Sequence, residues 1–171
     1  SLIDNSLYGT STKSDYVKGK YKILRIGNIG YCDFDLSDIK KVDISDDNFE
    51  KYLVKKGDLL IVRSNGNPKL VGKCAVWDNN EEYVYASYLI RFRFKKELVL
   101  PKYIMYFFMS DKGRDMMKPK SGGGTNNISA TEFKQLQVPL PTIYKQQEII
   151  KEIEQGLSEV KRIQLFGVNA K

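Results

Sequence analysis

The sequence predicts an α+β fold, with a twisted, mainly antiparallel sheet, a few packed helices and a long, coiled-coil-like helix at the C-terminus. Three observations support this class. Short apolar runs between turn-forming residues fill the stretch 21–94, which is typical of strands. Apolar residues at helical spacing begin after Pro101. A second helical stripe runs from Tyr144 to about Phe166.

The expected strands follow one another closely. Tyr21–Ile29 reads as the first, with a turn around Gly27 and Gly30, and the fully apolar run Leu59–Val62 fits a buried strand. Val71–Trp77 and Tyr83–Phe94 are the next two. Because these four runs are close in sequence, we expect them to pair in one twisted sheet.

Other parts of the first half lack a strand pattern. Residues 1–20 are small and polar, and we expect them to form a loop. The acidic segment 33–50 is expected to be irregular, with a short helix near Asp46 to Tyr52.

Helical signals dominate the second half. Pro101 suits the first turn of a helix, and a further short helix is expected around Asp111 to Met117. Ser129 and Glu132 have the spacing of a capping box, which indicates a helix start there. Leu136–Val138 reads as a short strand stopped by prolines.

The C-terminal helix carries a narrow apolar stripe with heptad spacing. Its members are Ile150, Ile153, Leu157 and Val160. Two readings stay open, because two heptads are too few to identify a coiled coil. The stripe is either an interface for another helix or the face with which this helix packs on its own domain.

Composition describes one globular unit. The chain has 171 residues, of which 42% are hydrophobic and 29% are charged, and it contains no histidine. It is long enough for one domain with its own core. We expect Cys32 and Cys74 to be free, reduced core residues in a cytoplasmic protein, and we expect no metal or cofactor.

Charge is unevenly distributed. The net charge is +7, but residues 33–50 hold seven acids against Lys40 and Lys41, so the remainder carries 26 basic and 14 acidic side chains. Such a surplus suits a polyanion bound on one face, with the acidic segment turned elsewhere. A solvated basic surface is the alternative.

The residues do not assemble a known catalytic set. The three glycines 122–124 lack the Lys-Ser/Thr pair of a phosphate-binding P-loop. Without histidine there is no Ser-His or Cys-His pair. Asn67-Pro68 is followed by Lys69, so the amino-methyltransferase motif is missing, and Asp58 lacks the partners of a nuclease site. We therefore expect a non-enzymatic chain.

Two polar segments are the main candidates for binding a polyanion, and their side chains are of the kinds that contact bases and phosphates. The loop 63–69 carries Arg and Asn side chains, which can grip guanine and adenine with paired hydrogen bonds, so we assign base reading to it. The glycine-rich loop exposes backbone N–H groups beside lysines, which suits phosphates. A solvated hairpin turn and a plain connector are the alternatives for the two segments.

Sixteen residues are candidate DNA contacts. For bases they are Arg63, Ser64, Asn65, Asn67 and Lys69. For phosphates they are Lys118, Lys120, Ser121, Gly123, Thr125, Asn126 and Asn127. Arg91 and Arg93 share one face of a strand, where they either line the DNA-binding face or lie along the sheet, and Arg25 and Asn28 are weaker candidates.

Several motifs, taken in order, resemble the target recognition domain of a type I restriction-modification specificity subunit. They are Tyr8-Gly9-Thr10-Ser11, residues 23–29, Gly57-Asp58-Leu59-Leu60-Ile61, residues 71–76, the glycine-rich loop with Ile128-Ser129, the Pro-Leu-Pro end at 139–141, and Gln147-Glu148. Each motif is weak alone, but their shared order over residues 8–154 is specific.

The resemblance implies a non-catalytic subunit of a restriction endonuclease and DNA adenine methyltransferase complex. It would read one half of a split double-stranded DNA site. Residues 1–143 would be the recognition domain, and 144–171 would begin the spacer or dimerisation helix that docks methyltransferase subunits and, through them, the restriction subunit. The chain would then be a fragment, or a half-subunit that dimerises or joins a second recognition domain in a prokaryotic cytoplasm.

Three rival functions stay open at this point, and one of them is an unrecognised enzyme, which would need a buried, pKa-shifted carboxylate pair near a pocket. The other two are binding functions. One is the recognition domain of a single-chain restriction enzyme-methyltransferase. The other is an assembly module that binds protein through its C-terminal helix and does not bind DNA.

Overall fold

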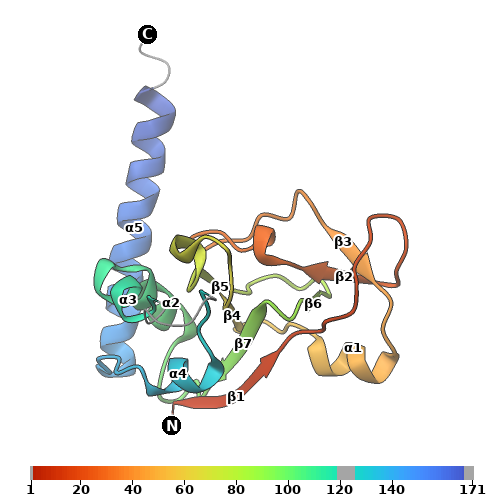
Figure 1. Cartoon of the computed structure of the whole chain (residues 1–171). Coiled ribbons are helices and arrows are strands. Elements are labelled where there is room, and N and C mark those ends of the chain that lie inside the picture. Colours follow the sequence, from red (N-terminus) through yellow and green to blue (C-terminus); the bar gives the residue numbers. More distant parts are fainter. Residues whose placement is uncertain (1, 119–125, 168–171) are drawn as a thin grey trace.

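The computed structural model describes residues 2–118 and 126–167. Seven strands and five α-helices are assigned there (Figure 1). The strands are β1 Ile3–Tyr8, β2 Tyr21–Leu24, β3 Lys40–Val42, β4 Leu59–Val62, β5 Cys74–Val76, β6 Val84–Tyr85 and β7 Leu89–Phe94. The helices are α1 Asp46–Tyr52, α2 Pro101–Met109, α3 Asp111–Met116, α4 Ala130–Gln135 and α5 Ile143–Gly167. Two 3-10 turns cover Ile26–Asn28 and Pro68–Leu70.

The predicted α+β class is confirmed, but the strands form two sheets instead of one. The larger sheet is antiparallel, in the order β1-β7-β4-β5, and the smaller has the order β3-β2-β6 with β2 and β6 parallel. The expected strand Tyr83–Phe94 breaks because a turn closes from Leu89 N–H to the Ala86 carbonyl. That turn sends β6 to one sheet and β7 to the other.

The N-terminal segment corrects a second expectation. It is not a loop throughout, because Ile3–Tyr8 forms β1 at the edge of the larger sheet. Its pairing with β7 is irregular between Ile3 and Asn5. An edge strand buries only part of its side chains, and the burial of β1 is accordingly mixed, so its sequence lacks a clear alternation of polar and apolar residues.

The larger sheet separates two clusters of the core. Leu59 and Ile61 of β4 face the cluster that includes α2 and α4, whereas Leu60 and Val62 face the opposite cluster. Ile90, Phe92 and Phe94 of β7 join the first cluster, as their alternation predicted. A strand covered on both faces is apolar throughout, which explains why all four residues of β4 are buried.

Local signals set the ends of several helices. Pro101 occupies the first turn of α2, and Ser129 and Glu132 form the expected capping box at α4. The expected strand Leu136–Val138 is wrong, because no strand is assigned there. Leu136 and Val138 instead pack against the core, and Tyr103 Oη donates to the Pro139 carbonyl at 2.8 Å.

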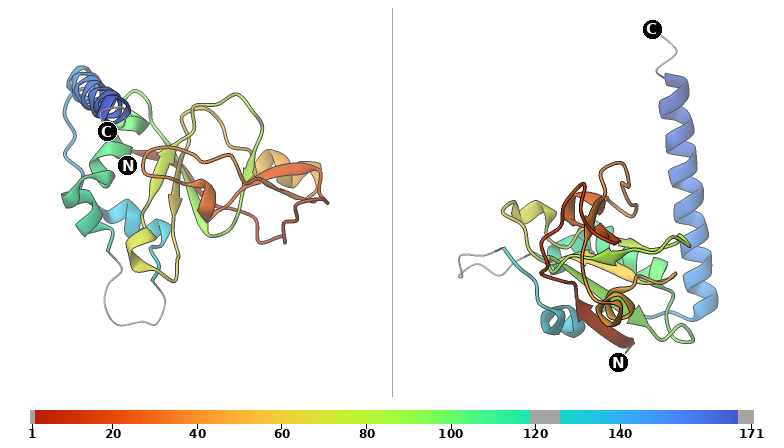
Figure 2. Two further views of the ribbon diagram at one scale, coloured as in Figure 1. Left: turned by 90° about the horizontal axis from the view of Figure 1, so that it is seen from above. Right: turned by 90° about the vertical axis from the view of Figure 1, so that its right-hand side faces the viewer.

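Helix α5 has a buried base and an exposed upper half. Gln146 is fully buried, accepts from Leu100 N–H at 2.8 Å, and donates to the Leu98 and Pro141 carbonyls. Ile149 and Ile150 pack against the core. Further along, Leu157 and Val160 are 46% and 51% exposed, and the helix rises beyond the body of the protein (Figures 1 and 2).

The two thiols are free, as expected. Cys74 is buried, and Cys32 is half-buried and adopts a left-handed φ of 68°. Burial and the nearby Asp33 carboxylate raise the pKa of the Cys32 thiol to about 11, which disfavours a reactive thiolate. Among the described residues, no helix is both long and apolar enough to cross a membrane.

Candidate nucleic-acid interface

The structure brings the loop 63–69 and the described end of the glycine-rich segment side by side. Residues 63–69 and 126–128 form what we call the loop pair. Ser64 and Asn127 make an antiparallel bridge, Ile128 N–H donates to the Arg63 carbonyl at 2.8 Å, and Asn65 N–H donates to the Asn126 carbonyl at 3.3 Å. Asn126 Nδ2 also donates to the Gly66 carbonyl. The segments are about sixty residues apart in sequence but form one surface.

Arg63, the first residue of the loop 63–69, holds the loop pair together through contacts inside the protein. Its Nε donates to Asn127 Oδ1 at 3.1 Å, its Nη1 donates to the Ser87 carbonyl, and its guanidinium lies over the Tyr8 ring. A paired grip on guanine uses Nη2 with either Nε or Nη1. One of these internal bonds would have to open first, so the structure assigns Arg63 a positioning role in this conformation.

Asn65 and Asn67 shape the tip of the loop. Asn65 Oδ1 accepts from Asn67 N–H at 2.9 Å, and Asn67 Oδ1 accepts from Lys69 N–H at 3.0 Å. Each amide oxygen keeps a second lone pair, and each Nδ2 can donate. Asn67 and Lys69 are exposed and Asn65 is half-buried, so the tip can present amide groups to a base edge.

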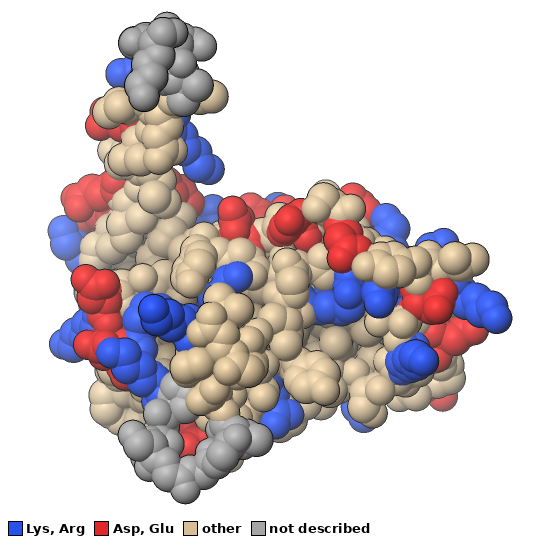
Figure 3. Space-filling model, turned by 45° about the horizontal axis from the view of Figure 1, so that its top comes forward, with Lys and Arg blue, Asp and Glu red and all other residues tan. Residues whose placement is uncertain are grey.

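A basic pocket borders the loop pair. Tyr31, Pro68, Lys69, Val71, Arg114 and Lys118 line a cavity of about 480 Å³. Arg114 Nη2 donates to the Lys69 carbonyl at 2.6 Å, which ties α3 to the loop. Figure 3 shows Lys and Arg side chains interspersed with Asp and Glu side chains around the lower part of the projecting helix. A DNA strand that reached the loop tip would find cations beside it.

The phosphate candidates can be placed only in part. Lys118 is exposed and pairs with Asp115 at 2.5 Å, and Asn126 and Asn127 belong to the loop pair. The remaining four candidates lie outside the described residues; they are Lys120, Ser121, Gly123 and Thr125.

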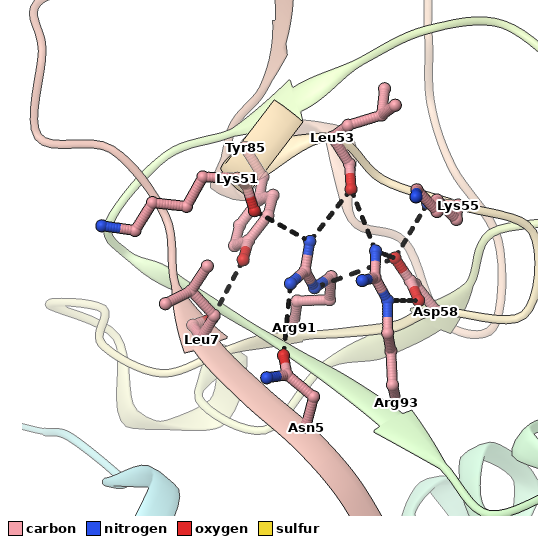
Figure 4. Close-up of polar contacts among 9 residues, drawn as sticks. All are labelled: Asn5, Leu7, Lys51, Leu53, Lys55, Asp58, Tyr85, Arg91 and Arg93. Atoms are coloured by element: carbon pink, nitrogen blue, oxygen red, sulfur yellow. Dashed lines mark hydrogen bonds and ion pairs between the residues drawn. The ribbon is translucent and has the colours of Figure 1, made fainter. Parts of the chain in front are cut away.

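The two strand arginines do not line this interface. Arg91 is 3% exposed, and its guanidinium donates to the Lys51 and Leu53 carbonyls and to Asn5 Oδ1 (Figure 4). Arg93 makes two hydrogen bonds to the buried carboxylate of Asp58, at 2.8 and 3.0 Å. The expectation that Arg91 contacts DNA is corrected because its side chain is buried, and half-buried Arg93 is engaged with Asp58 and is not part of the loop pair. Both serve the packing of β7.

Their environment also shifts their pKa values in opposite directions. Burial lowers the pKa of Arg91, whereas the hydrogen bonds that Arg93 donates to Asp58 raise the pKa of Arg93. A guanidinium stays charged in either case. Two cations therefore share one carboxylate inside the domain.

Asn28 is likewise internal, and Arg25 is engaged at the surface. Asn28 is 2% exposed, donates to the Asp35 and Asp38 carbonyls, and accepts from Arg25 N–H. Arg25 forms an ion pair with Asp38 at 2.9 Å. Asn28 cannot reach DNA without unfolding this turn, so its assignment as a DNA contact is corrected.

Sequence reasoning missed three residues beside the loop pair: Tyr31, Lys73 and Arg114. Tyr31 is 59% exposed, and Lys73 Nζ lies 5.0 Å from the centre of its ring. The backbone bond from Cys32 N–H to the Cys74 carbonyl brings the two together. Only the aromatic residue between Gly30 and Cys32 hints at this in the sequence, because the contact depends on pairing across forty residues.

Comparisons with known proteins identify the family of this chain. Residues 8–164 match the model of the type I restriction modification DNA specificity domain. The chain belongs to this family. It is 31% identical over 159 residues to the Type I restriction enzyme EcoKI specificity subunit of Escherichia coli (strain K12), covering 91% of this chain and 34% of that protein. It is 28% identical over 147 residues to the Putative type I restriction enzyme MjaX specificity subunit of Methanocaldococcus jannaschii, covering 84% and 34%.

Solved structures share the fold of this specificity domain. A chain from a study of complex assembly and conformational transition of the type I R-M system superposes with a TM-score of 0.69 at 16% identity, covering 97% of this chain and 39% of that one. The HsdS subunit from Thermoanaerobacter tengcongensis superposes with a TM-score of 0.65 at 12% identity, covering 97% and 45%. The domain spans about a third of the length of the curated relatives.

Proposed function

We propose that this specificity domain binds double-stranded DNA and reads one half of a bipartite site for a type I restriction-modification complex. The loop pair is the observation that carries the proposal, since it joins base-reading side chains to backbone and basic groups on one surface. Asn65, Asn67 and Lys69 would meet base edges, and Lys118 and Arg114 would meet phosphates.

The same proposal gives the domain no reaction of its own. Among the described residues no group of His, Cys, Asp or Glu is arranged to hold a metal ion, and the buried carboxylate of Asp58 is engaged with Arg93. Methylation and cleavage would belong to partner subunits. DNA binding of this kind would act in a prokaryotic cytoplasm.

Helix α5 would connect the domain to those partners. Leu157 and Val160 are exposed on its upper half, while Ile150 packs near its base. We propose that the exposed part of the stripe meets a methyltransferase subunit, the helix of a second recognition domain or a second copy of this chain. In this proposal the lower part of the stripe packs on its own domain, and the exposed upper part is the interface for another helix.

The test is selection of bound duplexes from a random pool, with the domain joined to its methyltransferase partner. The proposal expects enrichment of one short motif, and Asn67→Ala should relax the preference at one or two positions of it. Selection without any enriched motif would contradict sequence reading. If Asn67→Ala keeps the same motif and loses affinity equally for all sequences, Asn67 does not read a base.

A further inference from the structure

A second basic pocket lies at the end of the larger sheet away from the loop pair. Its lining comes from the turn before β4 and the turn after β7, and it encloses about 540 Å³. We call it the lysine pocket, and its lining residues are Asp4, Lys55, Lys56, Gly57, Asp58, Arg93, Phe94, Lys95, Lys96 and Glu97. The loop pair follows β4 at Arg63, so the two sites stand at opposite ends of one strand.

The lining carries an excess of positive charge. Five cationic side chains face three carboxylates there. One carboxylate, Asp58, is committed to Arg93 and lies 3.8 Å from Arg91 Nε. Because buried Arg91 and half-buried Arg93 share this carboxylate (Figure 4), Asp58 is engaged with them and does little to offset the charge of the four lysines that line the pocket. A concave surface with walls of low dielectric constant concentrates such a field.

The lysines are available to a ligand. Lys55, Lys56, Lys95 and Lys96 are all exposed, and Lys96 extends across Gly57, 3.5 Å from the place where a Cβ would stand. Lys56 also pairs with Asp78 at 2.9 Å, an exposed contact that a competing anion can replace. Arg93 donates to Asp58 and Leu53 from Nε and Nη2, so its Nη1 can donate to a ligand.

The chemistry of the lining favours phosphate over a protein partner. Protein interfaces bury apolar and aromatic anchors at their centres and are depleted in lysine. Of the described lining residues only Phe94 is a large apolar residue, and it is 7% exposed. Lysine is a compact charge on a flexible stem that adapts to phosphate oxygens. Several such charges suit phosphate groups spaced closely along a chain.

We propose that the lysine pocket is a second anion site, separate from the loop pair, that binds closely spaced phosphate groups. The phosphates come either from a nucleic-acid backbone, read without sequence preference, or from a free phosphorylated molecule. The site does not depend on the proposed sequence reading, because it shares no residue with the loop pair.

The test follows backbone amide signals of the 171-residue chain by NMR during titration with sodium tripolyphosphate and, separately, with a random-sequence duplex. Shifts at Gly57 and Lys95–Glu97 are expected. The variant Lys55→Gln/Lys95→Gln/Lys96→Gln should lower the affinity for tripolyphosphate about tenfold or more. The control Lys13→Gln/Lys18→Gln/Lys41→Gln removes the same charge from exposed lysines outside the pocket and should change it less than about twofold.

The two titrations distinguish a free phosphorylated ligand from a nucleic-acid backbone, and a third titration tests an acidic protein segment. Shifts with tripolyphosphate alone identify a free phosphorylated ligand, and shifts with both probes identify a nucleic-acid backbone. Equal binding of polyglutamate of matched charge would overturn the phosphate assignment in favour of an acidic protein segment. The proposal would also be overturned if no amide signals shifted at the pocket, or if the control variant lost as much affinity for tripolyphosphate as the pocket variant. Thermal unfolding confirms that both variants are folded, and motif selection through the loop pair is scored independently.

Discussion

The loop pair and the Arg91–Arg93 network use the same residue types in opposite ways at the two ends of β4 and β7. At the network, two arginines are folded inside against Asp58 and backbone carbonyls. At the loop pair, Arg63 joins the two segments through its hydrogen bond to Asn127, while Asn67 and Lys69 stay exposed at the tip of the loop. A basic residue is therefore available to DNA only where the fold leaves its donors unused.

The largest expected effect comes from Asp58→Ala. It removes the buried carboxylate shared by buried Arg91 and half-buried Arg93, and breaking a buried pair in this way costs about 3–5 kcal/mol of unfolding free energy. Chemical denaturation measures the loss. The control Asp78→Ala removes an exposed pair with Lys56 and should cost at most about 1 kcal/mol. Equal losses of unfolding free energy in the two variants would show that the buried ion pairs of Asp58 stabilise the fold no more than the exposed pair of Asp78.

Gln146→Ala should come next. It leaves the Leu100 N–H and two carbonyls at the start of α5 without their hydrogen-bond partner, and an unsatisfied buried group costs about 1–3 kcal/mol of unfolding free energy. Gln147→Ala, at the adjacent exposed position, should stay within about 0.5 kcal/mol. Denaturation of both variants decides the point, and an unchanged midpoint for Gln146→Ala would mean that water replaces the glutamine.

Asn67→Ala tests whether the exposed tip of the loop pair reads a base. If its amide reads adenine, discrimination at one base pair should fall by about 1–3 kcal/mol while other positions keep their preference. Competition binding with single-base variants of the selected duplex measures this. Asn79→Ala is the matched control, since Asn79 Oδ1 also accepts a backbone N–H two residues on, and its effect on discrimination should be nil.

The smallest effect concerns salt dependence. Lys69→Gln should flatten the slope of log affinity against log salt by about one unit, because the ammonium group that would meet a base edge also neutralises phosphate charge beside it. Lys118→Gln should flatten it less, since Lys118 already pairs with Asp115. Binding across a salt series measures both slopes, with Lys18→Gln as the control. An unchanged slope for Lys69 would place it away from the phosphates.

Local chemistry explains the parts that the sequence predicted well. The strand Leu59–Val62 and the helix starting at Pro101 follow from apolar period and proline geometry, and both are confirmed. The helix expected from Tyr144 begins at Ile143. The family resemblance is confirmed as well. The assignment of individual DNA contacts at the loop tip stays a prediction.

The failures share a cause, which is pairing between distant segments. β1 is a strand because it finds an edge on β7, and Arg91 is buried because Leu53 and Asn5 close over it. The alternation of β7 correctly placed Arg91 and Arg93 on one face. It did not indicate that this face would be covered.

The sequence by itself determined the class of the fold, the limits of its strongest elements and the family, because periodicity, caps and ordered motifs are written in neighbouring residues. Only the tertiary structure decided that Ser64 meets Asn127 and that Arg93 meets Asp58. Such contacts depend on which surfaces are buried together, and burial sets whether a charge faces solvent or must find a partner inside.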